Sequence, residues 1–449
     1  LACVESDEGR AAGRCGLGSV MGSKNLKAMA ARGTGKIEIS REDEFRRIRQ
    51  QALDEISKSA GTKSMHLHGT SGGLIAHHDM GNLPIRNWTR GELPGVEKIT
   101  GATMTETMLI GRKACFGCPI GCGRYIEVKA EPYTTKGYGP EYETIGALGS
   151  MCWNTNLESI AKANNICCEY GVDTISVGCV IAFAMECYEN GIITREDTGG
   201  LDLSWGNHEA VVKMTELIGT KEGFGATLGE GVRAAAEKIG KGADRFAMHA
   251  KGLELPLHNP YRYKSMGLNY ATGNRGGCHN RGSPAYLERG ILSPEVGFNE
   301  KLDGFTVEGK GRATKIHQDL CALVDAWGVC KFAVFFCGMS LTSIRDMFNA
   351  VTGWDMSWDD LMSAGERIWN LERAFNVRMG VTRKDDTLPE RFVKEPMPNG
   401  FAKGQTVDLE PMLAEYYAVR VLDENGKPRR EKLQELGLDF AVHLLYEGI

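Results

Sequence analysis

Apolar positions at helical spacing recur through most of the chain and are punctuated by glycine. The clearest runs predict one helix over residues 157–170, ending at Gly171, and a second over residues 174–189, ending at Gly191. Strand-like alternation is scarce, so the pattern indicates a predominantly α fold. Four capping boxes are predicted, beginning at Ser40, Thr103, Thr194 and Ser357. Further helices are expected over residues 40–59, shortly after 103–106, over 228–239, from about 313 to 331, over 341–352 and over 358–379.

Two stretches lack this periodicity. Residues 60–102 are rich in glycine, proline, asparagine and histidine and are predicted to be a long irregular connection. Their four histidines (His66, His68, His77 and His78) are interpreted as surface or loop residues, since no cysteine or acidic partner shares their spacing. Residues 250–310 are also aperiodic, and so long an irregular stretch in a compact domain usually forms functional surface. The C-terminal segment is expected to hold turns and one closing helix.

Composition narrows the class of protein without defining its chemistry. The chain has 449 residues, enough for two or three domains, and an ordinary apolar content of 42%. A net charge of −5 gives no reason to expect nucleic acid or an anionic membrane as a partner. No apolar run approaches the length of a membrane span, and no signal sequence is visible. Fourteen cysteines without a secretory signature favour a reducing, cytoplasmic compartment. The first residue, Leu1, reads like the interior of a domain, so a truncated start is expected.

Three cysteines crowd into one short segment. Cys115, Cys118 and Cys122 have the spacing C-x2-C-x3-C in a loop broken by glycine and proline. Three thiolates so close together can converge on one metal centre, and a [4Fe–4S] cluster needs four. Zinc is the competing interpretation, and inert structural cysteines are a third. The unequal spacing favours the cluster, with the fourth ligand elsewhere in the chain.

A glycine-rich segment near the start is flanked by cations. It begins at Arg14, contains Gly16 and Gly18, and continues past Lys24. The spacing fits neither the Rossmann fingerprint nor the Walker A loop. Exposed backbone N–H groups among cations nevertheless suit an anionic phosphate group, and a tight turn is the alternative.

One short pattern occurs twice. Residues 168–173 (Cys-Glu-Tyr-Gly-Val-Asp) and 325–330 (Asp-Ala-Trp-Gly-Val-Cys) share a Gly–Val pair after a helical run. The spacing places both pairs at the C-terminus of a helix, where the neighbouring residues could face a common ligand. Coincidence between two helix ends is the alternative.

Taken in order, these segments resemble the tungsten-containing aldehyde:ferredoxin oxidoreductase family over essentially the whole chain. The three-cysteine run with a distant Cys330 looks like the four-cysteine set of that family, and the two Gly–Val frames look like its pair of pterin motifs. Five other segments, at residues 14–27, 139–143, 251–254, 275–279 and 378–389, also look like family segments. Two departures stand out: Cys168 replaces the usual aspartate of the first pterin frame, and valine replaces leucine in both frames.

The resemblance implies a fold and a domain organisation. Residues 1–38 would be the end of an N-terminal β-rich domain that supplies a base for the cofactor. Residues 39–248 and 249–449 would be two helical domains that enclose a tungstopterin and a [4Fe–4S] site. The first helical domain would hold three cluster cysteines and the first pterin motif, and the second would hold Cys330 and the second motif.

The resemblance also implies the cofactors and the residues that hold them. A tungsten (or molybdenum) bis-pyranopterin would lie beside a [4Fe–4S] cluster, with magnesium bridging the pterin phosphates. The cluster ligands would be Cys115, Cys118, Cys122 and Cys330. Cys278 is interpreted as lining of the site. The residues expected to bind the pterins are Arg14, Gly16, Gly18, Lys24, Asp173, Asp325, Gly328 and Val329.

The implied reaction is oxidation of an aldehyde to a carboxylic acid, with electrons leaving through the cluster to ferredoxin or another low-potential carrier. Glu141 is the expected general base, with Glu143 as the alternative, and His279 would orient the carbonyl and donate to the developing oxyanion. A homodimer or an electron-transfer subunit is a further expected partner. A benzoyl-CoA-reducing catalytic subunit is the runner-up, disfavoured because residues 144–160 lack the extra histidines of that subunit type. An electron-transfer protein with a vestigial site is the third hypothesis.

Overall fold

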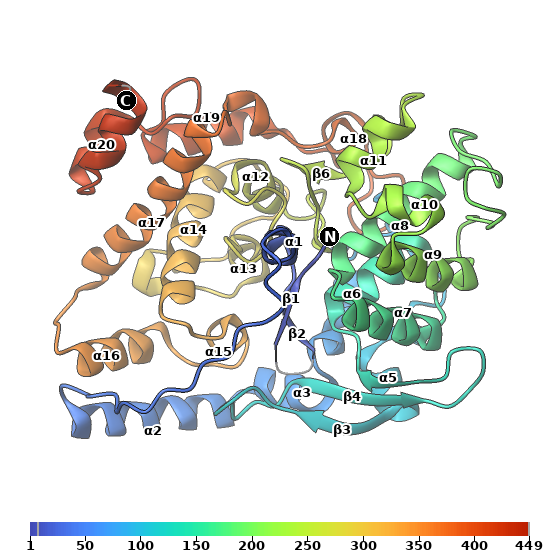
Figure 1. Cartoon of the computed structure of the whole chain (residues 1–449). Coiled ribbons are helices and arrows are strands. Elements are labelled where there is room, and N and C mark those ends of the chain that lie inside the picture. Colours follow the sequence, from blue (N-terminus) through green and yellow to red (C-terminus); the bar gives the residue numbers. More distant parts are fainter. Residues whose placement is uncertain (7–8, 448–449) are drawn as a thin grey trace. The chain divides into compact units, whose positions relative to one another are not determined.

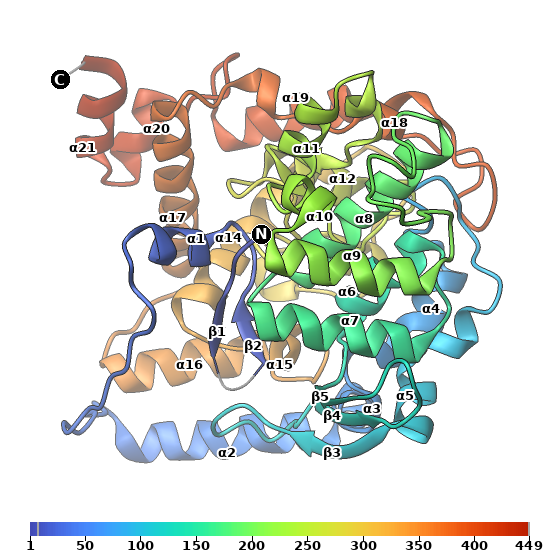
Figure 2. The ribbon, with the colours of Figure 1, turned by 45° about the vertical axis from the view of Figure 1, so that its right-hand side comes forward.

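Helices form most of the regular structure in the computed structural model, which describes residues 1–6 and 9–447 (Figures 1 and 2). The predicted predominantly helical fold is confirmed. The chain forms two compact units, each assembled from three separate stretches. The first unit contains Leu1–Ala31, Ser64–Arg262 and Pro389–Thr406, and the second contains Arg32–Lys63, Tyr263–Leu388 and Val407–Ile449. These two units are not the domains inferred from the resemblance, so the domain boundaries at 38 and 248 stay a prediction.

The first unit is organised around α8 (Thr174–Glu189), which is buried on almost every side. Its side chains are apolar over most of their length, as expected for a helix inside a core. Asp173 begins the helix, since its side chain accepts the backbone N–H of Ser176 at 2.9 Å. The helices α7 (Leu157–Tyr170) and α9 (His208–Thr220) pack side by side, and α6 (Tyr142–Leu148) packs against α8 (Figure 2). The remaining helices of this unit are α1 (Leu17–Ser23), α4 (Leu74–Asp79), α5 (Gly101–Thr107), α6 (Tyr142–Leu148), α7 (Leu157–Tyr170), α9 (His208–Thr220), α10 (Gly223–Leu228), α11 (Val232–Ile239) and α18 (Glu390–Lys394).

Strands in this unit are short and antiparallel. β3 (Leu109–Lys113), β4 (Gly123–Val128) and β5 (Thr135–Tyr138) form a three-stranded sheet that the helical pattern did not predict. Strand runs this short carry little periodicity to distinguish them from loops. β1 (Val4–Ser6) pairs with β2 (Arg10–Ala12), and β6 (His249–Ala250) with β7 (Leu253–Glu254).

The second unit is centred on α14 (Lys310–Ala326), which packs against α17 (Trp358–Arg378) and α19 (Leu409–Arg420) (Figure 1). Arg420 of α19 is fully buried and donates to Asp319 of α14 at 2.5 Å, so the third stretch of this unit is joined to the second by a buried ion pair. α12 is buried along its whole length, although it lies in the stretch expected to be irregular. The other helices are α2 (Glu42–Lys58), α12 (Lys264–Thr272), α13 (Ala285–Arg289), α15 (Lys331–Phe335), α16 (Leu341–Thr352), α17 (Trp358–Arg378), α19 (Leu409–Arg420), α20 (Arg430–Glu435) and α21 (Asp439–Val442); α3 (Ala60–His68) crosses from one unit to the other.

Several sequence predictions of helix ends are confirmed and others are wrong. The capping box of Ser357 and Asp360 is present, and α7, α8 and α16 have the predicted extents. Arg41 rather than Ser40 precedes α2, and Thr100 rather than Thr103 caps α5, because a residue three positions before an acidic side chain is only a candidate cap. Thr194 bonds Asp197, but a turn follows instead of a helix. The stretch 60–102 contains α3 and α4, and the C-terminal segment contains four α-helices rather than one. Among the described residues, none of the helices has the length and apolar character that a membrane crossing requires.

Polar contacts join the separated stretches of each unit. In the first unit, Arg391 donates to Glu186 of α8 at 2.6 Å and to the backbone carbonyl of Asn87 at 2.6 Å. In the second unit, Glu55 of α2 accepts the backbone N–H of Ser340 at 3.0 Å. These contacts hold residues 389–406 against the rest of the first unit and residues 32–63 against the rest of the second.

Candidate active site and metal-binding loop

The three clustered cysteines lie on the turn between β3 and β4. The two strands pair up to Lys113 and Gly123, which closes the turn at its base. Within it, the backbone N–H of Cys118 donates to the carbonyl of Cys115 at 3.0 Å, and the N–H of Ile120 points at the sulfur of Cys118 at 3.4 Å. Backbone N–H groups directed at thiolate sulfur stabilise its negative charge, as in iron–sulfur sites. The structure therefore brings the three cysteines onto one short closed loop.

A buried arginine supports this loop from below. Arg124 is 2% exposed and donates three hydrogen bonds to backbone carbonyls: to Cys122 at 3.1 Å, to Gly121 at 2.9 Å and to Leu67 at 2.8 Å. No carboxylate of the described chain lies within ion-pair distance of its guanidinium. Burial lowers the pKa of Arg124. A buried cation that lacks a carboxylate is costly unless another negative group lies nearby, and thiolates of the loop would supply that charge.

Arg124→Met is expected to lower the free energy of unfolding by about 1–3 kcal/mol, because it leaves three partly buried carbonyl groups without this donor. Urea unfolding of the metal-free protein measures this. Arg112→Met is the matched control: Arg112 is exposed and donates only to the carbonyl of His66, at 3.0 Å, so its loss should cost no more than about 0.5 kcal/mol. Equal costs for the two variants would contradict the bracing role of Arg124.

The repeated Gly–Val pattern proves to be one kind of helix end used twice. After α7, Gly171 has φ of +64°, and the N–H of Val172 donates to the carbonyl of Cys167 at 2.9 Å. After α14, Gly328 has φ of +67°, and the N–H of Val329 donates to Val324 at 3.2 Å. Both are Schellman-type ends, in which glycine supplies the left-handed residue. In both, the next residue (Asp173 or Cys330) begins the following helix. The prediction that both pairs terminate helices is confirmed.

The expected pterin-binding residues of the first unit are linked to one another. Arg14 is buried, lies 3.4 Å from the carboxylate of Asp173, and donates to the backbone carbonyl of Glu254 at 2.6 Å. Gly18 lies against the backbone of Ala2 and Cys3, just before β1, where a Cβ atom would be 2.3 Å from the carbonyl oxygen of Cys3. Only glycine fits there. Gly16 precedes α1, and Lys24 follows it with its side chain exposed.

Asp325 and Cys330 are the corresponding residues in the second unit. Asp325 forms ion pairs with Lys331 and, at 3.5 Å, with Arg281. Cys330 is exposed at the start of α15. His279 follows the buried Cys278 in a loop whose carbonyls of Cys278 and Gly282 accept from the buried Asn269 side chain. The proposed convergence of Cys330 with the three loop cysteines, and of His279 with the glutamates, stays a prediction.

The two candidate bases have different surroundings. Glu141 is 36% exposed, lies 2.9 Å from Arg10 and accepts the hydroxyl of Thr70 at 2.5 Å. Glu143, on α6, is 16% exposed and accepts the backbone N–H of Leu257 at 2.9 Å. Burial raises the pKa of Glu143 to about 7, although the Leu257 N–H and the nearby Arg14 oppose that rise and Asp173 adds to it. Of the two, Glu143 has the environment of a general base at neutral pH.

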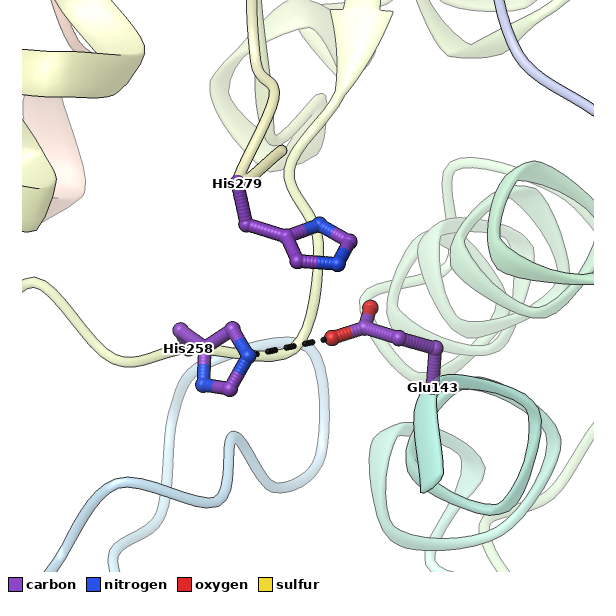
Figure 3. Close-up of side chains that lie close together, drawn as sticks. All are labelled: Glu143, His258 and His279. Carbon is purple, nitrogen blue, oxygen red and sulfur yellow. Dashed lines mark ion pairs between the residues drawn. The ribbon is translucent and has the colours of Figure 1, made fainter. Parts of the chain in front are cut away.

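A histidine pair beside Glu143 was missed by the sequence interpretation. His258 places Nε2 at 3.4 Å from Oε1 of Glu143, as Figure 3 shows. The Asn82 side chain lies 2.9 Å from Nδ1 of His258 and 2.6 Å from Nδ1 of His77. The interpretation of His77 as a surface residue is therefore wrong, since it is 8% exposed. No sequence signal joins these three residues, because they come from separate loops and one short helix.

Comparisons with known proteins agree with the motifs. The family profile described as aldehyde ferredoxin oxidoreductase, domains 2 and 3, matches residues 47–438, and the N-terminal-domain profile of the same family matches residues 1–33. The tungsten-containing aldehyde ferredoxin oxidoreductase of Pyrococcus furiosus is 40% identical over 443 residues, covering 98% of this chain and 71% of that protein. The enzyme of the same name from Thermococcus kodakarensis has the same identity and coverage.

Two more distant proteins are also similar. The WOR-like subunit of an aliphatic sulfonate oxidoreductase from Pyrococcus furiosus is 32% identical, covering 96% of this chain and 67% of that protein. The solved active-site complex BamBC of benzoyl coenzyme A reductase, with 1,5-dienoyl-CoA, has a TM-score of 0.79 at 23% identity and covers 99% of this chain and 72% of the other. At that identity the likeness shows a shared fold.

Proposed function

Because the chain belongs to the aldehyde ferredoxin oxidoreductase family, we propose that it oxidises aldehydes to carboxylic acids with a tungsten pterin cofactor and passes the electrons through a [4Fe–4S] cluster to ferredoxin. The observation that carries the proposal is the 40% identity over 98% of the chain to tungsten-containing members. The 23% identity to the benzoyl coenzyme A reductase complex supports the fold and gives no separate basis for an acyl-CoA substrate.

The described residues fit the proposed groups. The cysteine turn would supply Cys115, Cys118 and Cys122 to the cluster, and Cys330 would be the fourth ligand. The buried cation of Arg124 suits the net negative charge of a thiolate-bound cluster. The two equivalent helix ends would hold the two pterins through Asp173 in one unit and Asp325, Gly328 and Val329 in the other. The N-terminal segment would face the phosphates with Arg14, Gly16, Gly18 and Lys24.

Oxidation of an aldehyde adds an oxygen atom from water and releases two electrons and two protons. When bound, the tungsten pterin supplies the two-electron acceptor for this reaction. We assign proton removal from water to Glu143, whose burial raises its pKa to about 7. His279 would orient the substrate and donate to the carbonyl oxygen. Glu141, held by Arg10 and Thr70, would have a structural part.

The proposal is tested on the protein purified without oxygen. Elemental analysis should find about one tungsten and about four iron atoms per chain, the iron content of one cubane cluster. Dye-linked assays should show oxidation of simple aldehydes and no reaction with aryl-CoA thioesters. Iron without tungsten or molybdenum would refute the proposal, and zinc alone would refute the cluster. Bridging magnesium, a homodimer or electron-transfer subunit, and a reducing, cytoplasmic location stay predictions.

A further inference from the structure

We propose that Asn82 keeps His258 neutral, with its proton on Nε2, so that a neutral N–H faces the carboxylate of Glu143. In this inference Asn82 and His258 are positioning residues that keep Glu143 basic near neutral pH. Its catalytic meaning rests on the proposed function, in which Glu143 is the base. The tautomer itself can be read without turnover.

The orientation of the Asn82 amide is fixed by a third contact. The side chain is fully buried, and its Oδ1 accepts the backbone N–H of Asn259 at 3.0 Å. Turning the amide over would place its NH2 group against that N–H, donor against donor. The oxygen must therefore face Asn259, and the NH2 group must face the two histidine rings.

The amide then determines the tautomer of both rings. An NH2 group has two hydrogens and accepts none, so Nδ1 of His258 and Nδ1 of His77 must each act as an acceptor. A neutral imidazole with an acceptor at Nδ1 carries its hydrogen on Nε2. A fully protonated His258 would press an Nδ1–H against the amide N–H in a buried place. The contact thus disfavours the imidazolium and leaves Nε2–H facing Glu143 (Figure 3).

A neutral neighbour matters because Glu143 needs a raised pKa to act as a base near pH 7. An imidazolium 3.4 Å away would stabilise the carboxylate and make it a weaker base. Two charged groups of the first unit also act on the pKa of Glu143: Arg14 lowers it and Asp173 raises it. Two aromatic rings contact His258: Tyr142 stacks on it at 5.5 Å, and His77 lies edge-on at 5.7 Å. Asn82 is thus placed to disfavour protonation of His258 at Nδ1.

The decisive variant is Asn82→Asp, which nearly preserves shape and exchanges a donor for an acceptor. The new carboxylate would accept Nδ1–H of His258 and stabilise the imidazolium. In the pH profile of kcat, the acidic limb should then shift to lower pH by at least about one unit. This is the usual effect of an opposite charge at this distance. Asn154→Asp is the matched control, because Asn154 is equally buried but bonds Ser159 and the carbonyl of Leu148. It should leave the limb in place.

Two further measurements test the inference, and the second does not depend on the folding of Asn82→Asp. The double variant Asn82→Asp/His258→Gln should lose the shift, since the ring that faces Glu143 is then absent. ¹⁵N spectra of the histidine-labelled wild-type holoenzyme, with the His258 signal assigned by its absence in His258→Gln, should show Nδ1 without a proton and Nε2 with one. An Nδ1–H or an imidazolium at His258 at neutral pH would overturn the inference, as would an unmoved limb in a folded Asn82→Asp.

These outcomes are separable from those of the proposed function. A wild-type protein that oxidises no aldehyde refutes the proposed function, and the nitrogen spectra still decide the tautomer. Conversely, an active wild-type enzyme with a proton on Nδ1 of His258 refutes the inference and leaves the proposed function standing.

Discussion

Replacing Glu143 by glutamine is expected to lower kcat for aldehyde oxidation by a factor of about 10²–10⁴, the usual contribution of a general base. The amide keeps the shape of the side chain and can still accept the N–H of Leu257, but it cannot take a proton from water. In the wild-type enzyme the rate should rise with pH through about 7, because the base must be ionised and burial raises the pKa of Glu143 to about that value. Dye-linked assays from pH 5 to 9 measure both effects.

Glu141→Gln is the matched control, two residues away in the same segment. It weakens a partly exposed contact with Arg10, and we expect a loss below about fivefold, equivalent to ~1 kcal/mol. Both variants should retain tungsten and iron. A large loss in Glu141→Gln together with a small one in Glu143→Gln would transfer the role of base to Glu141.

Cys330→Ser is expected to remove most of the iron and to lower electron transfer to ferredoxin at least about 100-fold. A [4Fe–4S] cluster needs four thiolates, and the turn between β3 and β4 provides three. Iron analysis and the electron paramagnetic resonance signal of the reduced cluster measure the loss.

Cys15→Ser serves as the control for Cys330→Ser, because both thiols are exposed and only one belongs to the proposed ligand set. The control should keep its iron and its signal. If Cys330→Ser also keeps about four iron atoms per chain and an unchanged signal, the fourth ligand lies elsewhere.

The sequence predicted helices best where their ends were marked. Asp173 and Gly171 delimit α8 and α7, because a capping side chain and a left-handed glycine are local requirements that the sequence displays directly. The sheet around the cysteine turn was not predicted, since its strands hold six residues or fewer and are stabilised by pairing with one another. α12 was missed because it is buried on all sides and so lacks a polar face.

In the candidate site, too, local features could be predicted from the sequence and long-range contacts could not. The cysteines and the Gly–Val pairs were identifiable because their spacing is local, and the two Gly–Val pairs do end helices as predicted. The difference between Glu141 and Glu143 could not be predicted, because it depends on burial and on the distant residues Leu257 and Arg10. The Asn82–His258 contact joins residues far apart in the chain and leaves no trace in spacing.

The interleaved construction of the two units constrains how the protein is made. The first unit needs residues 389–406, with the Arg391–Glu186 pair, and the second needs residues 407–449, with the Arg420–Asp319 pair. On the ribosome, the first unit cannot close before residues 389–406 have been synthesised, and the second cannot close before residues 407–449 have been synthesised. Fragments cut at residue 248 should therefore not fold independently into these units.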